Sequence, residues 1–142
     1  MSDDASMLLG SWLLRRFQIE DLATGERNDA YGLDPRGMAI FMPNGRMAAM
    51  ITPRHQPVPA SEADRAAAFA SMIAYSGRYR LEPPDRFVTT VDVSWLALWT
   101  DTDQGRTYRL DGDKLEIISA PGPSPHGGGA MVRGILSWVR EA

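Results

Sequence analysis

Hydrophobic and polar side chains alternate along much of the chain, and this pattern predicts β-strands. Residues 12–19 are apolar at 12 and 14 and then at 17 and 19, so the alternation slips by one residue, as a β-bulge near Arg15 and Arg16 would produce. In residues 87–95, apolar side chains or threonine occupy every second position, with mostly polar residues between them. Such runs are typical of strands with one face toward a core and the other toward solvent.

Two short turn sequences predict β-hairpins. Residues 37–42 and 47–51 flank Pro43-Asn44-Gly45-Arg46, and Asn-Gly tolerates the positive φ of tight hairpin turns. Asp111-Gly112-Asp113 separates two further short runs in the same way. The first hairpin is apolar on both faces, so we expect one face in the interior and the other against a helix or a partner.

One α-helix is predicted between the third and fourth strands. Residues 53–59 are rich in proline, which lacks the backbone N–H of a central strand and predicts a connector. Ser61 is a plausible N-cap and Gly77 a plausible end, which gives a helix of about fourteen residues with one apolar stripe. We expect residues 53–77 to form a lid and one wall of a cavity, since only an open barrel mouth would leave apolar surface for that stripe.

The sequence therefore predicts an all-β fold, an up-and-down antiparallel β-barrel of about eight strands with one inserted α-helix. Eight meandering strands leave two exposed edges unless the sheet closes, and one short helix cannot cover a flat sheet of that size. A closed sheet of about eight strands has an interior that can hold one small ligand.

Composition narrows the class of protein. The 142 residues, 44% of them hydrophobic, fit one domain over residues 1–142, with residues 1–8 as a flexible tail. The net charge of −3 and the scattered basic residues argue against a nucleic-acid partner. Met7-Leu8-Leu9 is too short for a signal peptide or a membrane span, and there is no cysteine, so we expect a cytoplasmic protein without membrane association.

Four segments carry a resemblance to a known family. Gly10-Ser11-Trp12 is similar to the Gly-x-Trp signature of lipocalins. The other three are Tyr31-Gly32-Leu33-Asp34-Pro35-Arg36-Gly37, Phe41-Met42-Pro43-Asn44-Gly45-Arg46-Met47 and Ala74-Tyr75-Ser76-Gly77-Arg78-Tyr79. From residue 9 to 139 the chain resembles the small bacterial and fungal lipocalin-like domain proteins. The resemblance implies a barrel with a central cavity, closed at one end by Trp12, and it brings no catalytic motif.

Three polar residues around the predicted helix are candidate catalytic or ligand-orienting groups. His55 could act as a general base or orient a ligand, although a solvated loop histidine is the more usual case, since the sequence supplies no partner for it. Tyr75 and Arg78 lie near the predicted helix end, where Arg78 could bind a carboxylate of a ligand or of the protein itself. His126 lies in a glycine-rich loop and is the alternative site.

The chain also carries aromatic and methionine side chains that suit an apolar, deformable pocket. The candidate ligand-binding residues are Phe41, Met50, Phe69, Tyr79, Trp95, Trp99 and Tyr108. Ordinary core packing would explain much of the same composition.

No metal or cofactor is expected. The two histidines have no Asp, Glu or Cys at the spacing of a metal site, and Asp101-Thr102-Asp103 is typical of a turn. The three consecutive glycines at 127–129 are not followed by the lysine of a phosphate-binding loop. Glu20 and Asp92 lie on strands, where an inward carboxylate would have a raised pKa suited to proton transfer. The alternation places Asp92 on the outward side.

Three functions remain open. The first is binding of a small apolar or aromatic molecule in the barrel. The second is a cofactor-independent isomerase, cyclase or lyase that acts on a small carbonyl or polyketide-like compound in the same cavity. The third is an assembly module that forms a homodimer through the apolar hairpin. A titratable group with a hydrogen-bonded partner inside the cavity would favour the enzyme, and a filled interior would favour the module.

Overall fold

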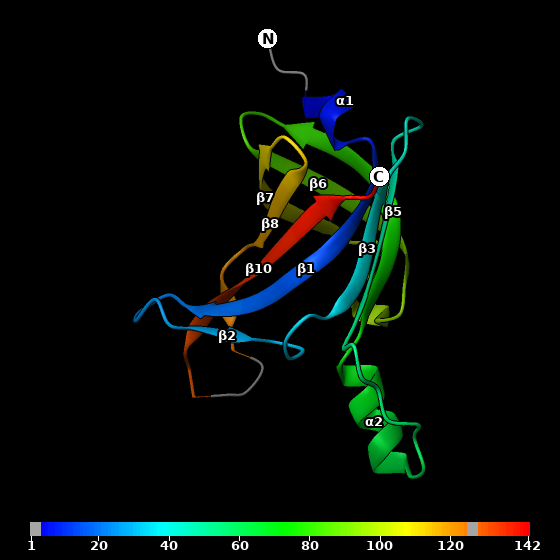
Figure 1. The fold of residues 1–142 in the computed structure, drawn as a ribbon, viewed down its shortest axis with the longest axis vertical. Coiled ribbons are helices and arrows are strands. Elements are labelled where there is room, and N and C mark those ends of the chain that lie inside the picture. Colours follow the sequence, from blue (N-terminus) through cyan, green and yellow to red (C-terminus); the bar gives the residue numbers. More distant parts are fainter. Residues whose placement is uncertain (1–3, 125–127) are drawn as a thin grey trace.

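The computed structural model describes residues 4–124 and 128–142, which form a sheet of ten strands and three helical segments (Figure 1). The strands are β1 (Gly10–Asp21), β2 (Arg27–Asp29), β3 (Arg36–Phe41), β4 (Arg46–Thr52), β5 (Ile73–Glu82), β6 (Arg86–Ser94), β7 (Asp103–Asp111), β8 (Lys114–Ser119), β9 (Gly122–Pro123) and β10 (Met131–Arg140). The helical segments are α1 (Asp4–Leu8), α2 (Glu62–Ala70) and the 3₁₀ turn η1 (Ala97–Trp99).

Eight of these strands close into an antiparallel barrel. Each pairs with the next in the order β1, β3, β4, β5, β6, β7, β8 and β10, and β10 pairs back onto β1 from Trp12 opposite Arg140 to Asp21 opposite Val132. The short strands β2 and β9 add to the sides of β1 and β10. The predicted up-and-down barrel is therefore confirmed, and closure leaves the eight long strands without a free edge.

Local turn and bulge signals are confirmed as well. The pairing of β1 with β10 shifts register between Leu14 and Arg16, which is the predicted bulge. The hairpin from β3 to β4 turns at Gly45, whose φ is 89°, and the Met42 N–H donates to the Arg46 carbonyl at 2.8 Å. A positive φ costs glycine little, so this turn sets the hairpin register.

One strand departs from the predicted alternation. Ser76 lies opposite Val93, whereas the next residue of β5, Gly77, lies opposite Val91, so β6 bulges at Asp92. The bulge turns Val93 outward, where it is 63% exposed instead of facing the core. A Cβ on Gly77 would lie 2.1 Å from the Thr90 carbonyl oxygen, so glycine here permits close approach of the strands and does not end a helix.

The helix α2 is shorter than predicted and does not form a lid. It begins at the predicted N-cap, where the Ser61 hydroxyl oxygen accepts the Asp64 N–H at 3.1 Å, but it spans only nine residues. None of its side chains is buried, and in Figure 1 it extends beyond the end of the barrel opposite α1. Its apolar positions are mostly alanine, so it has little surface to gain by packing on the barrel.

The other end of the barrel is capped by α1 (Figure 1). Leu8 and Trp12 have no exposed surface, and Trp12 Nε1 donates to the Leu8 carbonyl at 2.9 Å. The Arg140 guanidinium lies 4.2 Å above the Trp12 ring, and its Nη1 donates to the Leu9 carbonyl at 2.8 Å. The flexible tail predicted for residues 1–8 is therefore wrong for residues 4–8, because Leu8 is needed to cover Trp12. We call this the capped end and the opposite one the cavity end.

Candidate ligand-binding site

A cavity of about 270 Å³ lies inside the barrel at the cavity end. Its lining includes Ile51, Ile73 and Val132, which lie near the ends of their strands farthest from α1. Three small residues that point inward, Ala39, Ala49 and Gly134, also line it. Because Ala39 and Ala49 stand where larger side chains would reach the centre of the barrel, the space is built into the strands themselves, whereas a Cβ on Gly134 would lie 3.3 Å from the Phe17 ring.

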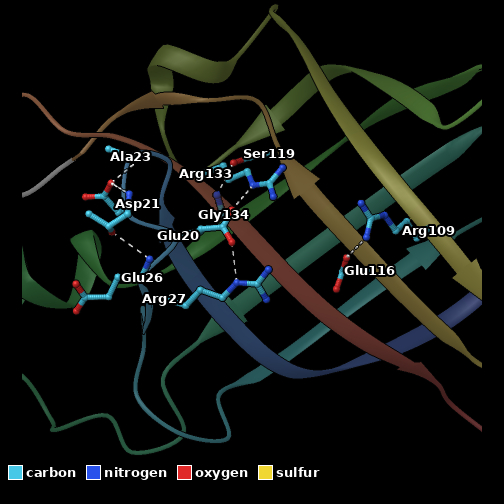
Figure 2. A network of polar contacts seen from close by, with 11 residues as sticks. Glu20, Asp21, Ala23, Glu26, Arg27, Arg109, Glu116, Ser119, Arg133 and Gly134 are labelled. Carbon is cyan, nitrogen blue, oxygen red and sulfur yellow. Dashed lines mark hydrogen bonds and ion pairs between the residues drawn. The ribbon is translucent and has the colours of Figure 1, made fainter.

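The lining is mostly apolar. Its polar side chains among the described residues are Tyr75, Arg106, Ser119 and Arg133, together with the indole groups of Trp99 and Trp138. The Ser119 hydroxyl oxygen accepts the Gly134 N–H at 2.7 Å (Figure 2). No histidine, aspartate or glutamate belongs to the described lining, so the cavity holds hydrogen-bond donors but no carboxylate.

Three of the lining side chains form a stack. The rings of Tyr75 and Trp99 meet edge to face with centroids 5.3 Å apart, and the Arg106 guanidinium carbon lies 5.7 Å from the Trp99 centroid. Burial raises the pKa of the Tyr75 hydroxyl, and the nearby charge of Arg106 lowers it in part. Tyr75 is therefore a neutral phenol near pH 7 and can donate a hydrogen bond.

The main site residue missed by sequence reasoning is Arg106. It lies on β7 opposite Ser119 of β8, two positions before the buried Tyr108. Because side chains two apart in a strand share a face, a buried tyrosine at 108 indicates that 106 also points inward. The alternation along β7 therefore identifies Arg106 as inward only once Tyr108 is known to be buried.

Comparison with known proteins identifies the fold family. The family model for the lipocalin-like domain matches residues 9–141. The chain belongs to the lipocalin-like domain family. Two solved structures are similar to this lipocalin-like barrel: a lipocalin-like protein from Bacteroides uniformis and an uncharacterized protein from Bacteroides eggerthii. The first is 13% identical in sequence and the second 15%, with TM-scores of 0.48 and 0.46. Each alignment covers 94% of this chain, and it covers 98% of the first structure's chain and 99% of the second's.

No curated protein matches the chain. Within the described residues, no helix of this lipocalin-like barrel is both long and apolar enough to span a membrane. The family match thus identifies the fold, and the cavity itself has to indicate what is bound.

Beside the cavity, a charged network ties β1, β2 and β10 together (Figure 2). The Glu20 carboxylate accepts from Arg27 Nε and from Arg133 Nε, each at 2.8 Å. These hydrogen bonds, first from Arg27 and then from Arg133, lower the pKa of Glu20. Glu20 is therefore an ionised structural carboxylate and not an acid with a raised pKa, and the Arg133 guanidinium is already paired.

The other carboxylates considered from sequence also lie outside the cavity. Asp92 faces outward and accepts two hydrogen bonds from Arg46, at 3.0 and 2.8 Å, which lower its pKa. Asp101 lies in a turn with φ of 63°, and Asp103 accepts the Thr90 hydroxyl at 2.7 Å. In residues 4–124 and 128–142, no three metal-ligating side chains gather into a site.

Of the three predicted catalytic residues, only Tyr75 lines the cavity. His55 is exposed, in a groove between the proline-rich connector and α2. Arg78 points out of the barrel, because Tyr75 and Gly77 take the inward positions of β5, and its Nη1 donates to the Asn44 carbonyl at 3.0 Å. His126 lies outside the described residues.

Of the seven predicted ligand-binding residues, Trp99 lines the cavity. Phe41, Tyr79 and Tyr108 instead fill the capped half of the barrel. The ring of Phe41 meets those of Tyr79 and Phe87 edge to face, at 5.1 and 5.6 Å. The Tyr108 hydroxyl donates to an Asp4 carboxylate oxygen, and burial together with this carboxylate raises the pKa of Tyr108. These aromatic residues close off the end of the interior that α1 covers.

The remaining three lie outside the interior. Met50 is 59% exposed because it alternates with the inward residues Ala49 and Ile51 of β4. Phe69, on the protruding α2, is half exposed and has its ring centroid 6.4 Å from that of Trp95. Trp95 packs behind Trp99, with centroids 5.2 Å apart, and does not belong to the described lining.

Proposed function

We propose that this lipocalin-like barrel binds a small, mainly apolar or aromatic molecule in its cavity. The observation that carries the proposal is the partly open apolar space of about 270 Å³, which inward alanine residues leave inside a closed barrel. This is slightly below the roughly 300–1,000 Å³ of pockets for drug-sized ligands, which favours a small ligand. Lipocalin-like barrels typically bind small hydrophobic molecules.

The composition of the lining favours binding over acid-base catalysis. An isomerase, cyclase or lyase of the kind considered from sequence needs a base near its substrate, and His55 lies outside the cavity. The described lining contains no histidine or carboxylate that could replace it. The open interior also favours binding over a purely structural module, whereas homodimerisation and a cytoplasmic location stay predictions.

A cavity-filling substitution tests the proposal. Ala49→Phe would place a ring in the cavity, and Ala48→Phe would place the same ring on the outer face of the same strand. With 2-naphthylmethanol as the probe in isothermal titration, we expect Ala49→Phe to weaken binding about tenfold or more and Ala48→Phe to change it less than about threefold. Circular dichroism would check that both variants fold.

Equal binding by Ala49→Phe and the wild type would place the probe elsewhere and overturn the proposal. Native mass spectrometry of the protein purified from its own cells provides a check without a chosen probe. A retained small molecule, absent from the Ala49→Phe protein prepared in the same way, would support the cavity as the site.

A further inference from the structure

We infer that the ligand of this cavity carries a carboxylate, and that the Arg106 guanidinium binds it with the help of the Tyr75 hydroxyl. The inference rests on the proposed function, since it concerns the chemical class of the molecule that the cavity takes. It is based on how Arg106 differs from the other arginines and on the kind of polar groups in the lining.

Arg106 is an interior cation without an anion. Five of the described arginines have no carboxylate oxygen within 4.0 Å. Four of them are exposed to solvent, namely Arg15, Arg36, Arg65 and Arg78. Only Arg106 is partly buried, and it lines the cavity. Because an unpaired charge is costly to bury, an anion entering this site would offset that cost.

The contacts of Arg106 leave donors free. Its Nη1 donates to the adjacent Gly105 carbonyl at 2.8 Å, and its guanidinium carbon lies over the Trp99 ring. A guanidinium carries five N–H donors in a fixed fork, which matches the two oxygens of a carboxylate. The contact with the Trp99 ring, 5.7 Å from the guanidinium carbon to the ring centroid, uses none of these donors.

The neighbouring polar groups of the cavity are donors as well. The Tyr75 hydroxyl has no hydrogen-bond partner among the described residues. The buried indole N–H of Trp138 also lacks one there, and the Ser119 oxygen already accepts from Gly134. A site with unused donors and no carboxylate complements a group that only accepts hydrogen bonds. An ionised carboxylate is such a group, whereas an amine is not.

The apolar surroundings strengthen the preference of the cavity for an anionic group. Coulombic attraction grows as the dielectric constant falls, so the same pair is stronger in this lining than on the surface. The ligand class is therefore a small apolar or aromatic acid, with its hydrocarbon part against Ile51, Ile73 and the other aliphatic side chains. Cationic molecules of the same size should be rejected.

The test compares two probes that share one aromatic skeleton. 2-Naphthoate is ionised at pH 7, and 2-naphthylmethanol is its neutral counterpart. In isothermal titration at one salt concentration, we expect the wild-type protein to bind the acid about tenfold or more tightly than the alcohol. Equal affinities for the two probes would overturn the inference and leave the proposed function standing. Binding of neither probe would overturn both.

Substitutions then assign the preference to its residues. Arg106→Met should weaken 2-naphthoate binding about tenfold or more, while binding of the alcohol changes less than about threefold. Arg109→Met is the matched control, because Arg109 lies on the same strand, points outward and pairs with Glu116 at 3.8 Å (Figure 2). Tyr75→Phe should cost the acid about two- to fivefold. Retention of the full acid preference by Arg106→Met would overturn the assignment.

Discussion

Two arginines of the barrel stack on tryptophan rings, one at each end, and their surroundings differ. Arg140 lies 4.2 Å over Trp12 at the capped end, and Arg106 lies 5.7 Å from Trp99 at the cavity end. Arg140 donates to the carbonyls of Leu9 and Met7 and has an Asp113 carboxylate oxygen at 3.5 Å. Within residues 4–124 and 128–142, Arg106 donates only to the carbonyl of its own neighbour, Gly105.

The same contrast holds for the indole groups. Trp12 Nε1 donates to the Leu8 carbonyl, whereas the buried Nε1 of Trp138, which lines the cavity, has no partner among the described residues. Buried polar groups are normally hydrogen-bonded, and the Trp12 indole follows that rule, whereas the buried Thr89 hydroxyl, opposite Tyr79, lacks a partner among the described residues. The described cavity lining contains the unused donors of Trp138 and Tyr75, which are available to a ligand.

The largest expected effect is a loss of stability when the packing of the capped end is removed. Trp12→Ala removes a side chain with no exposed surface and its hydrogen bond to Leu8, so we expect the free energy of unfolding to fall by about 3–5 kcal/mol. Trp99→Ala, at the partly exposed rim of the cavity, should cost less than about 2 kcal/mol. Urea denaturation measures both, and similar losses would contradict the division into two ends.

The two arginines provide the next comparison. Arg140→Met should lower the free energy of unfolding by about 2 kcal/mol, because the carbonyls of Leu9 and Met7 lose their donor. Arg106→Met should change it by less than about 0.5 kcal/mol in the ligand-free protein, since it removes a charge that has no partner. A larger loss for Arg106→Met would show that this guanidinium stabilises the fold and is not reserved for a ligand.

A smaller effect, visible as a pH dependence, concerns the paired charges beside the cavity. The pKa of Glu20 is lowered from its ordinary 4.5 by Arg27 and Arg133, so its contribution to stability is present above that value and is lost as the pH falls through the lowered pKa. Glu20→Gln should therefore have a lower melting temperature than the wild type at pH 7, with the difference shrinking at pH of about 3. Glu26→Gln, an exposed neighbour, serves as the control. A difference that grows in acid would reverse the assigned sign.

The smallest expected effect is at His55. The residue is exposed and lies outside the cavity, so His55→Ala should change the free energy of unfolding by less than about 0.5 kcal/mol and 2-naphthoate affinity by less than about twofold. Denaturation and titration on the same preparation measure both. A large loss of affinity with the fold intact would move the site to the groove beside α2.

Features of the sequence that depend on neighbouring residues were predictable. The bulge near Arg15 and Arg16, the turn at Gly45 and the N-cap Ser61 follow from local alternation, glycine conformation and capping chemistry, and all three are confirmed. The barrel followed from counting these local elements, because many short strands with short turns must close to remove their edges.

Which side chains line the candidate site depends on contacts between residues that lie far apart in the sequence. Of the predicted site residues, Tyr75 and Trp99 line the cavity, while Phe41, Tyr79 and Tyr108 pack into the capped half. All five are aromatic residues that a hydrophobic pattern treats alike. Which half of the barrel is filled is decided by residues from several strands that meet only after closure, together with the helix α1 that covers Trp12.

By itself, the sequence determined most of the strands, the hairpin turns and the need for a closed sheet, since each depends on interactions between residues close in the chain. The first half of β5, from Ile73 to Gly77, was predicted as helix. Only the tertiary structure decided where the interior stays open and which side chains face it. The bulge at Asp92 turns Val93 outward through the pairing of two strands, and α2 protrudes without a buried side chain, with the Phe69 ring 6.4 Å from that of Trp95. The placement of Arg106 has the same origin, because closure of the barrel brings its charge beside Tyr75 and Trp99, where the described lining contains no carboxylate.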